Sequence, residues 1–190
     1  QYGNQWIGYV NGINTSYSSF LHTLRMISET CEVNVIGCYN WQNFLGGITK
    51  IKIDKMREWI IKKLNCLEGQ NQRSTRIMVD SLSEKMPERN KYLVIAHSEG
   101  SILAKGVLNR SPHNDQYILE CYGGIIDPNT VSCYSSKNYV CNKDYVVISY
   151  SISGGFSRSN CTMIDLNPLD SAGLDVHYIQ SHTYFELLQN

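Results

Sequence analysis

The feature that most constrains this chain is the pentapeptide Ala-His-Ser-Glu-Gly at residues 96–100. Residues 92–95 before it are apolar and typical of a buried strand, and residues 101–108 after it have the composition of a helix. A strand, a sharp turn with a central serine and a helix form the layout of a nucleophile elbow. Strand and helix nearly touch at such a turn, so the outer positions need small residues. Ala96, which stands where the consensus has glycine, and Gly100 meet that need.

The rest of the chain alternates strand-like and helix-like segments, which predicts the α/β class. Strands are expected at residues 6–10, 33–39, 92–96, 118–122, 139–141 and 161–166. Helices are expected from a cap at Ser18 or Ser19, and at 52–66, 101–108 and 183–188. After a loop at 69–76 we favour a helix at 77–86, with a strand beginning at 77–79 as the alternative, and residues 145–152 have no assignment. This order predicts a three-layer α/β/α sandwich around a mostly parallel sheet. Without a visible linker or repeat, we expect a single domain over residues 1–190, which could be a fragment of a longer protein.

Composition excludes several classes of function. Lys and Arg number 17 and Asp and Glu number 17, so no excess charge favours nucleic acid or an anionic membrane. No apolar run reaches the roughly 18 residues of a spanning helix. The seven cysteines are odd in number and have no zinc-ligand spacing. We expect reduced, buried thiols, which slightly favours a cytoplasmic location, over one or two disulfides in a secreted protein.

The elbow and the start of the chain resemble the α/β-hydrolase superfamily, most closely its minimal members. Small bacterial lipases and cutinase-like enzymes have about this length, and some carry an elbow of the form Ala-His-Ser-x-Gly, as at 96–100. Residues 9–14, Tyr-Val-Asn-Gly-Ile-Asn, look like the first strand and oxyanion loop of hydrolase-like proteins. The resemblance implies that Ser98 is the nucleophile, followed in chain order by an acid and a histidine.

The acid of this triad should follow a strand beyond the elbow. Asp144 lies three residues after the expected strand end at Cys141, in a segment that looks like the Asn-x-x-Asp-x-Val of many hydrolases. We favour Asp144 as the acid. Asp127 is the main rival, and Asp165 and Asp170 are further alternatives.

The histidine should lie in the last loop before the terminal helix. Two candidates exist, His182 and His177. We favour His182, because the segment from Ser181 to Phe185 resembles the His-x-x-Tyr/Phe ending of many hydrolases, and keep His177 as the alternative. His22, on an expected helix, and His113, in a polar turn, are expected to be solvated bystanders.

The remaining site residues follow from the elbow and the first loop. The backbone N–H of Glu99 and one from the loop at Gly12 or Ile13 are expected to form the oxyanion hole. The Glu99 carboxylate should point elsewhere, because it would otherwise oppose the developing negative charge. Tyr39 and Trp41, with Phe44 beside them, could line an acyl pocket or equally anchor the core and the loop.

The resemblance implies a serine hydrolase that cleaves a carboxylic ester through a Ser-His-Asp triad and an acyl-enzyme. Such a reaction needs no metal or organic cofactor, and the expected partner is a small acyl ester rather than nucleic acid. A short chain leaves little room for a lid, which suits short or medium acyl groups. A catalytically degenerate binding module on the same fold and an acyltransferase with the same triad remain alternatives. The sequence does not predict the oligomeric state.

Overall fold

The computed structural model describes residues 5–12, 15–40, 70–152, 156–173 and 177–189. Its strands are β1 (Trp6–Val10), β2 (Asn34–Cys38), β3 (Tyr92–His97), β4 (Tyr117–Tyr122), β5 (Ser135–Cys141) and β6 (Thr162–Ile164). Its α-helices are α1 (Tyr17–Cys31), α3 (Gln70–Lys85), α4 (Gly100–Leu108), α5 (Tyr145–Ile152) and α6 (His182–Gln189). Short 3-10 helices lie at Asn114–Gln116, Pro128–Thr130 and Arg158–Asn160.

The six described strands form one sheet in the order β2-β1-β3-β4-β5-β6, and every neighbouring pair is parallel. The chain steps from β1 outward to β2 and then returns to the other side of β1 to continue through β3. The strand order therefore reverses between β1 and β3. In open parallel sheets, ligands bind at the carboxyl ends of the strands at such a reversal. The segments that follow β1 and β3 are Asn11-Gly12 and the elbow.

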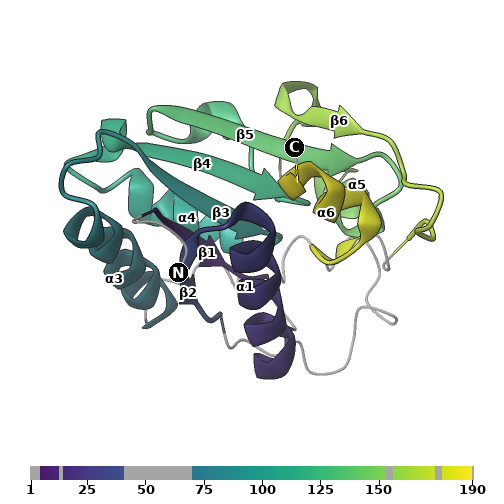
Figure 1. Ribbon diagram of the computed structural model, residues 1–190. Helices are drawn as coiled ribbons and strands as arrows, with labels where there is room; N and C mark the ends of the chain where they lie inside the picture. The colour runs from purple at the N-terminus through teal and green to yellow at the C-terminus, as the bar shows by residue number, and fades with distance from the viewer. Residues whose placement is uncertain (1–4, 13–14, 41–69, 153–155, 174–176, 190) are drawn as a thin grey trace.

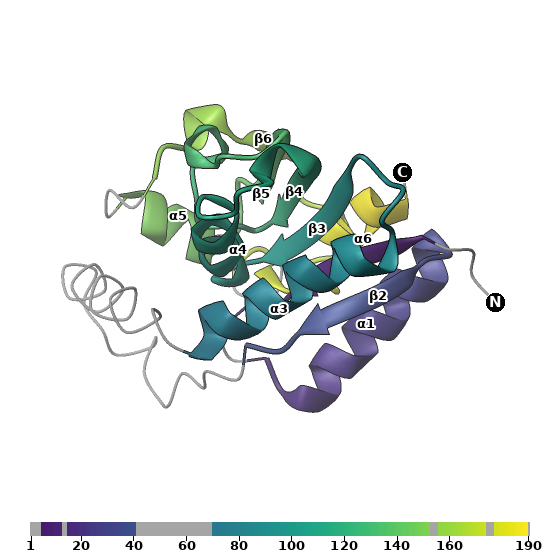
Figure 2. The ribbon, with the colours of Figure 1, turned by 90° about the vertical axis from the view of Figure 1, so that its left-hand side faces the viewer.

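Helices cover both faces of the sheet, as Figures 1 and 2 show for α3 and α4 on one side and α1 and α6 on the other. Each face has its own apolar core. The α3–α4 face buries Leu82, Leu103 and Leu119, and the α1–α6 face buries Phe20, Ile95 and Tyr184. Strands buried on both faces explain why the central strands read as continuous apolar runs. The α/β class and the three-layer arrangement are confirmed.

Several local expectations need correction. Helix α1 is capped by Ser16, whose hydroxyl accepts a hydrogen bond from the Ser19 N–H, and not by Ser18 or Ser19. Residues 70–76, expected as a loop, form the first turns of α3, whose buried side chains include Thr75, Met78 and Leu82.

The structure also changes the start of one strand and assigns a helix to residues that had no assignment. Strand β5 begins at Ser135, four residues earlier than expected, because polar residues pair in register with β4. The unassigned residues 145–152 form α5. The helix expected at 52–66 lies outside the described residues.

The six described cysteines are free thiols: Cys31, Cys38, Cys121, Cys133, Cys141 and Cys161. Among the described helices, none has the length and apolar character needed to cross a bilayer. Over the same residues, no group of three or more His, Cys, Asp or Glu side chains is placed to hold a metal ion.

Candidate active site

Ser98 occupies a strained turn between β3 and α4. Its backbone φ is +51°, in the left-handed region that residues with a Cβ rarely adopt. Such strain costs about 1–3 kcal/mol and persists only where the surrounding structure enforces it. A sharp turn of this kind points the serine side chain away from the strand, as in a nucleophile elbow.

Two close approaches enforce this turn. A Cβ added to Gly100 would lie 2.5 Å from the Val10 carbonyl oxygen and 2.7 Å from that of Asn11, both backbone atoms. A Cβ added to Gly12 would lie 2.7 Å from the Ser98 Cβ. Only glycine therefore allows α4 to start this close to β1 and the loop after β1 to pack on Ser98. The expected need for a small residue two positions after the serine is confirmed.

A histidine and an aspartate complete the arrangement. The His177 Nε2 lies 2.8 Å from the Ser98 Oγ, and the His177 Nδ1 lies 2.8 Å from the Asp144 Oδ2 and 3.0 Å from Oδ1. An ionised carboxylate only accepts, so Nδ1 carries the proton and donates to Asp144. The lone pair of Nε2 is then free to accept the Ser98 hydroxyl proton. Ser98, Asp144 and His177 follow in the chain order of nucleophile, acid and base.

The chain has the α/β-hydrolase fold. The structure combines three features of this fold. The sheet is parallel and covered on both faces, the serine lies on a strained strand-to-helix turn, and Ser98, Asp144 and His177 follow in this chain order. In the α/β-hydrolase fold the acid follows a later strand, and Asp144 lies just after β5, at the start of α5. The expected fold resemblance is thereby confirmed.

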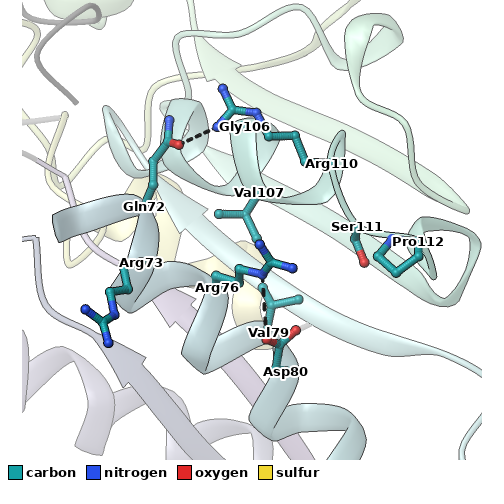
Figure 3. A pocket seen from close by; sticks show the side chains of 10 residues that line it. All are labelled: Gln72, Arg73, Arg76, Val79, Asp80, Gly106, Val107, Arg110, Ser111 and Pro112. Atoms are coloured by element: carbon teal, nitrogen blue, oxygen red, sulfur yellow. Dashed lines mark hydrogen bonds and ion pairs between the residues drawn. The ribbon is translucent and has the colours of Figure 1, made fainter. Parts of the chain in front are cut away.

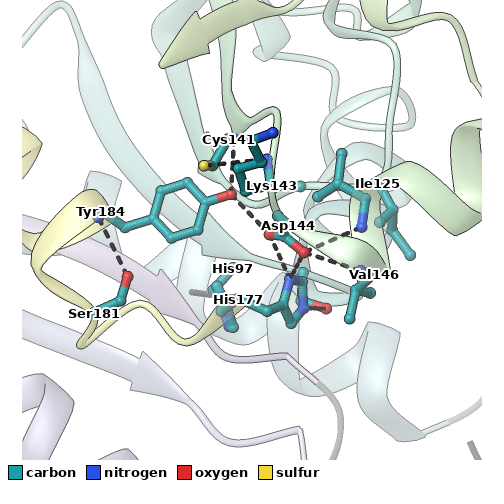
Figure 4. Close-up of polar contacts among 12 residues, drawn as sticks. His97, Ile125, Cys141, Lys143, Asp144, Val146, His177, Ser181 and Tyr184 are labelled. Atoms are coloured by element: carbon teal, nitrogen blue, oxygen red, sulfur yellow. Dashed lines mark hydrogen bonds and ion pairs between the residues drawn. The ribbon is translucent and has the colours of Figure 1, made fainter. Parts of the chain in front are cut away.

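Asp144 is fully buried, and both oxygens of its carboxylate accept hydrogen bonds (Figure 4). Its Oδ1 accepts from the Val146 N–H at 3.0 Å and the Val147 N–H at 3.3 Å, and its Oδ2 accepts from the Tyr184 hydroxyl at 2.8 Å. Burial by itself raises the pKa of this carboxyl, but the His177 charge and the hydrogen bonds outweigh burial and lower it. Asp144 is therefore ionised wherever a neutral His177 could act as a base.

His182, favoured from the sequence as the base, does not contact Ser98. It is the first residue of α6, its side chain is 55% exposed, and its Nδ1 lies 3.1 Å from the Asp170 Oδ1. Asp170 also accepts from the backbone N–H groups of His182 and Thr183 at the start of α6. This capping holds His182 at the helix start, and His177, five residues earlier, takes the position expected of it.

The other rival residues lie apart from Ser98. Asp127 caps the 3-10 helix at Pro128–Thr130 and accepts from the Asn160 side chain at 2.9 Å. Asp165 is exposed just after β6. His22 and His113 are exposed, in agreement with their interpretation as bystanders.

Tyr184 is a site residue that the sequence analysis missed. Its ring is fully buried under Asp144, its hydroxyl donates to Asp144 and accepts from the Cys141 N–H at 3.2 Å. Burial and the neighbouring carboxylate raise the pKa of the phenol, which therefore stays protonated as a donor. The only sequence signal was its place in the segment from Ser181 to Phe185 that was used to favour His182.

We expect Tyr184→Phe to destabilise the fold by about 1–3 kcal/mol, because it leaves the buried Cys141 N–H without its acceptor. The same change removes a donor from Asp144, so the pKa of Asp144 should rise. Urea unfolding of wild type and variant measures the first effect. An unchanged free energy of unfolding would contradict the hydrogen bonding described here.

His97 also lies in the site. From the sequence alone, no role beyond packing or hydrogen bonding was expected for it. It is 5% exposed, its ring centroid lies 5.0 Å from that of His177, and its Nε2 bonds to the His177 backbone carbonyl. A carbonyl only accepts, so Nε2 carries the proton. Burial, with the His177 charge adding to it, lowers the pKa of His97 to about 3. His97 therefore stays neutral beside the His177 ring.

This low pKa predicts a pH-dependent loss of stability. Below about pH 6.5 the unfolded chain binds a proton at His97 that the folded chain does not. The free energy of unfolding should therefore fall as pH drops from about 6.5 to about 3, by up to about 1.4 kcal/mol per unit from this group.

Replacing His97 by glutamine, which keeps an N–H donor, should flatten that slope. Asp144, with its lowered pKa, contributes in the same direction at the acid end and remains in both proteins. Urea unfolding at a series of pH values compares the two proteins. Parallel curves would show that His97 does not titrate as described.

The expected oxyanion-hole residues are only partly described. Gly12 lies against Ser98, and Glu99 follows the nucleophile at the start of α4. Glu99 is 7% exposed, and its carboxylate accepts from the Asn40 Nδ2 at 3.1 Å, so the carboxylate is held toward the end of β2. Ile13 and the pocket candidates Trp41 and Phe44 lie outside the described residues.

The remaining pocket candidate, Tyr39, packs against α1. Its ring lies 5.3 Å from Tyr17 and 5.1 Å from Phe20, and its hydroxyl donates to the Thr15 carbonyl at 2.9 Å. These contacts are those of an anchoring residue, which was one of its two expected roles.

A cleft of about 260 Å³ lies between α3 and the end of α4, apart from Ser98, Asp144 and His177 (Figure 3). Arg76 and Arg110 line it, but each guanidinium has a partner. Arg110 donates to Gln72 at 2.8 Å, and Arg76 lies 3.9 Å from Asp80. The cleft shares no residue with the triad.

Comparison with known proteins adds nothing about activity. No protein-family model and no curated protein matches the sequence. Two solved structures are similar over 98% of this chain. One is described as a proposed hydrolase of the alpha/beta superfamily from Xanthomonas campestris pv. campestris, with 13% identity, 98% of its chain covered and a TM-score of 0.47. The other is a predicted CIB-like hydrolase from Thermoplasma acidophilum, with 12% identity, 84% covered and a TM-score of 0.46.

Proposed function

We propose that the protein is a serine hydrolase that cleaves carboxylic esters through an acyl-enzyme. The observation that carries this proposal is the His177 imidazole, which bonds Ser98 through one nitrogen and Asp144 through the other. A serine is a weak nucleophile unless an adjacent base takes its proton, and this geometry provides such a base. A base that is itself oriented by a buried carboxylate is typical of acyl transfer.

In the proposed reaction, the Ser98 Oγ attacks the ester carbonyl carbon while the His177 Nε2 takes the hydroxyl proton. The tetrahedral intermediate collapses, the C–O bond to the alcohol breaks, and His177 returns the proton to the leaving alkoxide. Water then attacks the acyl-enzyme by the same route and releases the acid and Ser98. Asp144 keeps the His177 tautomer and stabilises the imidazolium.

The oxyanion of the intermediate needs donors that are in place before the reaction. The first N–H groups of a helix have no partner within it, and Glu99 precedes α4 directly after the nucleophile. The Glu99 N–H is therefore one proposed donor, and the Gly12 loop, which packs on Ser98, is the proposed source of the second.

A series of p-nitrophenyl esters with acyl chains of two to eight carbons tests the proposal. We expect nitrophenolate release well above the buffer rate, and a transient mass increase of one acyl group on the protein. Added alcohol or amine acceptors separate transfer from hydrolysis, because transfer diverts the acyl group from water. Well-folded protein with no release above buffer for any ester would contradict the proposed hydrolysis.

A further inference from the structure

A buried amide connects the loop after β1 to the segment after β2. Asn11 and Asn40 are both fully buried. The Asn11 Oδ1 accepts from the Asn40 backbone N–H at 2.7 Å, and the Asn11 Nδ2 donates to the Asn40 carbonyl at 3.1 Å. An N–H only donates and a carbonyl only accepts, so these partners fix the orientation of the Asn11 amide. The side chain thus pairs with Asn40 as a neighbouring strand would.

The same amide also holds the backbone of the loop that packs on the nucleophile. The Asn11 Nδ2 donates to the Gly12 carbonyl at 2.7 Å. A peptide is planar, so fixing this carbonyl fixes the plane of the peptide to which it belongs. Gly12 in turn packs directly on the Ser98 Cβ. The Thr15 hydroxyl donates to the same carbonyl at 3.1 Å. Asn11 therefore shares with Thr15 the placing of this loop relative to the reacting serine, and only Asn11 also joins it to Asn40.

The chain of contacts continues to the elbow from the other side. The Asn40 Nδ2 donates to the Glu99 carboxylate at 3.1 Å, and Glu99 adjoins Ser98. The segments after β1, β2 and β3 are thus joined through buried polar side chains. Buried groups bonded in this way are costly to break, because each lost partner leaves a desolvated polar group.

We propose that Asn11 is a positioning residue for the reaction of Ser98: it holds the Gly12 loop in the place where its backbone can stabilise the oxyanion. This inference rests on the proposed hydrolase function. It assigns Asn11 an effect on the reactivity of Ser98 and not only on the stability of the fold. Asn40 extends the same support to Glu99.

The test measures the rate constant for fluorophosphonate labelling of folded protein, in wild type, Asn11→Asp and Asn11→Ala. Asn11→Asp keeps the size but loses both amide N–H donors. Removing an oxyanion donor typically costs about 10²–10³ in rate, and displacing one should cost about 10–100-fold. In Asn11→Ala, which adds no ionisable group, the midpoint of the pH profile of labelling should not move, because the bonds from His177 to Ser98 and Asp144 are untouched.

Asn138 provides a matched control. It is 1% exposed, its Nδ2 donates to the carbonyls of Gly124 at 3.0 Å and Ile126 at 2.9 Å, and its Oδ1 accepts from the Gly124 N–H at 3.1 Å. Asn138→Asp and Asn138→Ala should therefore destabilise the fold about as much as the corresponding Asn11 variants do. We expect them to label within about twofold of wild type.

Asn40→Ser keeps both backbone bonds to Asn11 and removes the amide that donates to Glu99. It tests the support of Glu99 and should label about 3–10-fold more slowly. If neither Asn11→Asp nor Asn11→Ala folds, Asn11→Ser, which keeps one short hydroxyl donor, carries the test of Asn11. Wild-type labelling rates in the folded Asn11 variants would overturn the positioning role and leave the proposed hydrolase intact. A wild-type protein that does not label would overturn the proposed function itself, and this inference with it.

Discussion

Replacing Ser98 by alanine is expected to lower the turnover of acyl esters by about 10⁴-fold or more, while the chain stays folded. The change removes the only atom proposed to bond to the acyl carbon. Few packing contacts are lost, because the Ser98 Oγ bonds to His177 and the Cβ that packs on Gly12 remains. Nitrophenolate release and urea unfolding, measured on the same preparation, check both parts.

Ser28→Ala serves as the control for loss of a serine hydroxyl. The Ser28 Oγ donates to the Val33 carbonyl at 2.6 Å at the end of α1, in contact with no member of the triad. We expect it to lose stability and to keep its turnover. Ester turnover by Ser98→Ala within tenfold of wild type would show that another group performs the attack.

His177→Ala is expected to lower turnover by about 10³-fold or more, and His182→Ala by less than about threefold. His177 is the only one of the two whose ring reaches Ser98, at 2.8 Å. His182 is 55% exposed and pairs with Asp170 at the start of α6. The two variants remove the same side chain from positions five residues apart, so each is the control for the other.

The free energy of unfolding provides a second check on His182→Ala. His182→Ala removes a contact to Asp170 but keeps the backbone bonds by which Asp170 caps α6. Its free energy of unfolding should change by less than about 1 kcal/mol. An inactive His182→Ala together with an active His177→Ala would restore the sequence-based choice and refute the geometry described here.

The elbow could be predicted from sequence because all its requirements lie within a few residues. An apolar strand, a serine between small residues and a helix are local signals, and the close approach at Gly100 explains why they occur together. Asp144 could be predicted as a neighbour of the site because it follows a strand end. Its contact with Ser98 through His177 depends on the fold and was a hypothesis only.

The histidine could not be chosen correctly because both candidates lie between the last strand and the end of the chain. What separates them is the cap from Asp170, twelve residues before His182, which holds His182 at the start of α6. Neither spacing nor composition reveals such a long-range cap. Tyr184 was part of the segment that favoured His182, yet it contacts Asp144 instead.

The structural roles of several polar residues also could not be predicted from the sequence. The first half of β5 is Ser135 to Asn138, and these residues form a strand only because β4 offers a ladder to pair with. In the first turns of α3, Arg73 and Ser74 are polar and exposed, so they give no apolar periodicity. The contact between Asn11 and Asn40 joins residues 29 positions apart and leaves no periodic signal.

The most direct test of the central claim, that His177 and Asp144 activate Ser98, is labelling of the intact protein with a fluorophosphonate. Such a probe reacts with a serine that an adjacent base has made nucleophilic. Intact mass should show one adduct, and peptide mapping should place it on Ser98, with no adduct on Ser98→Ala and slow labelling of His177→Ala. A well-folded wild-type protein without an adduct, or with its adduct on another residue, would contradict the claim.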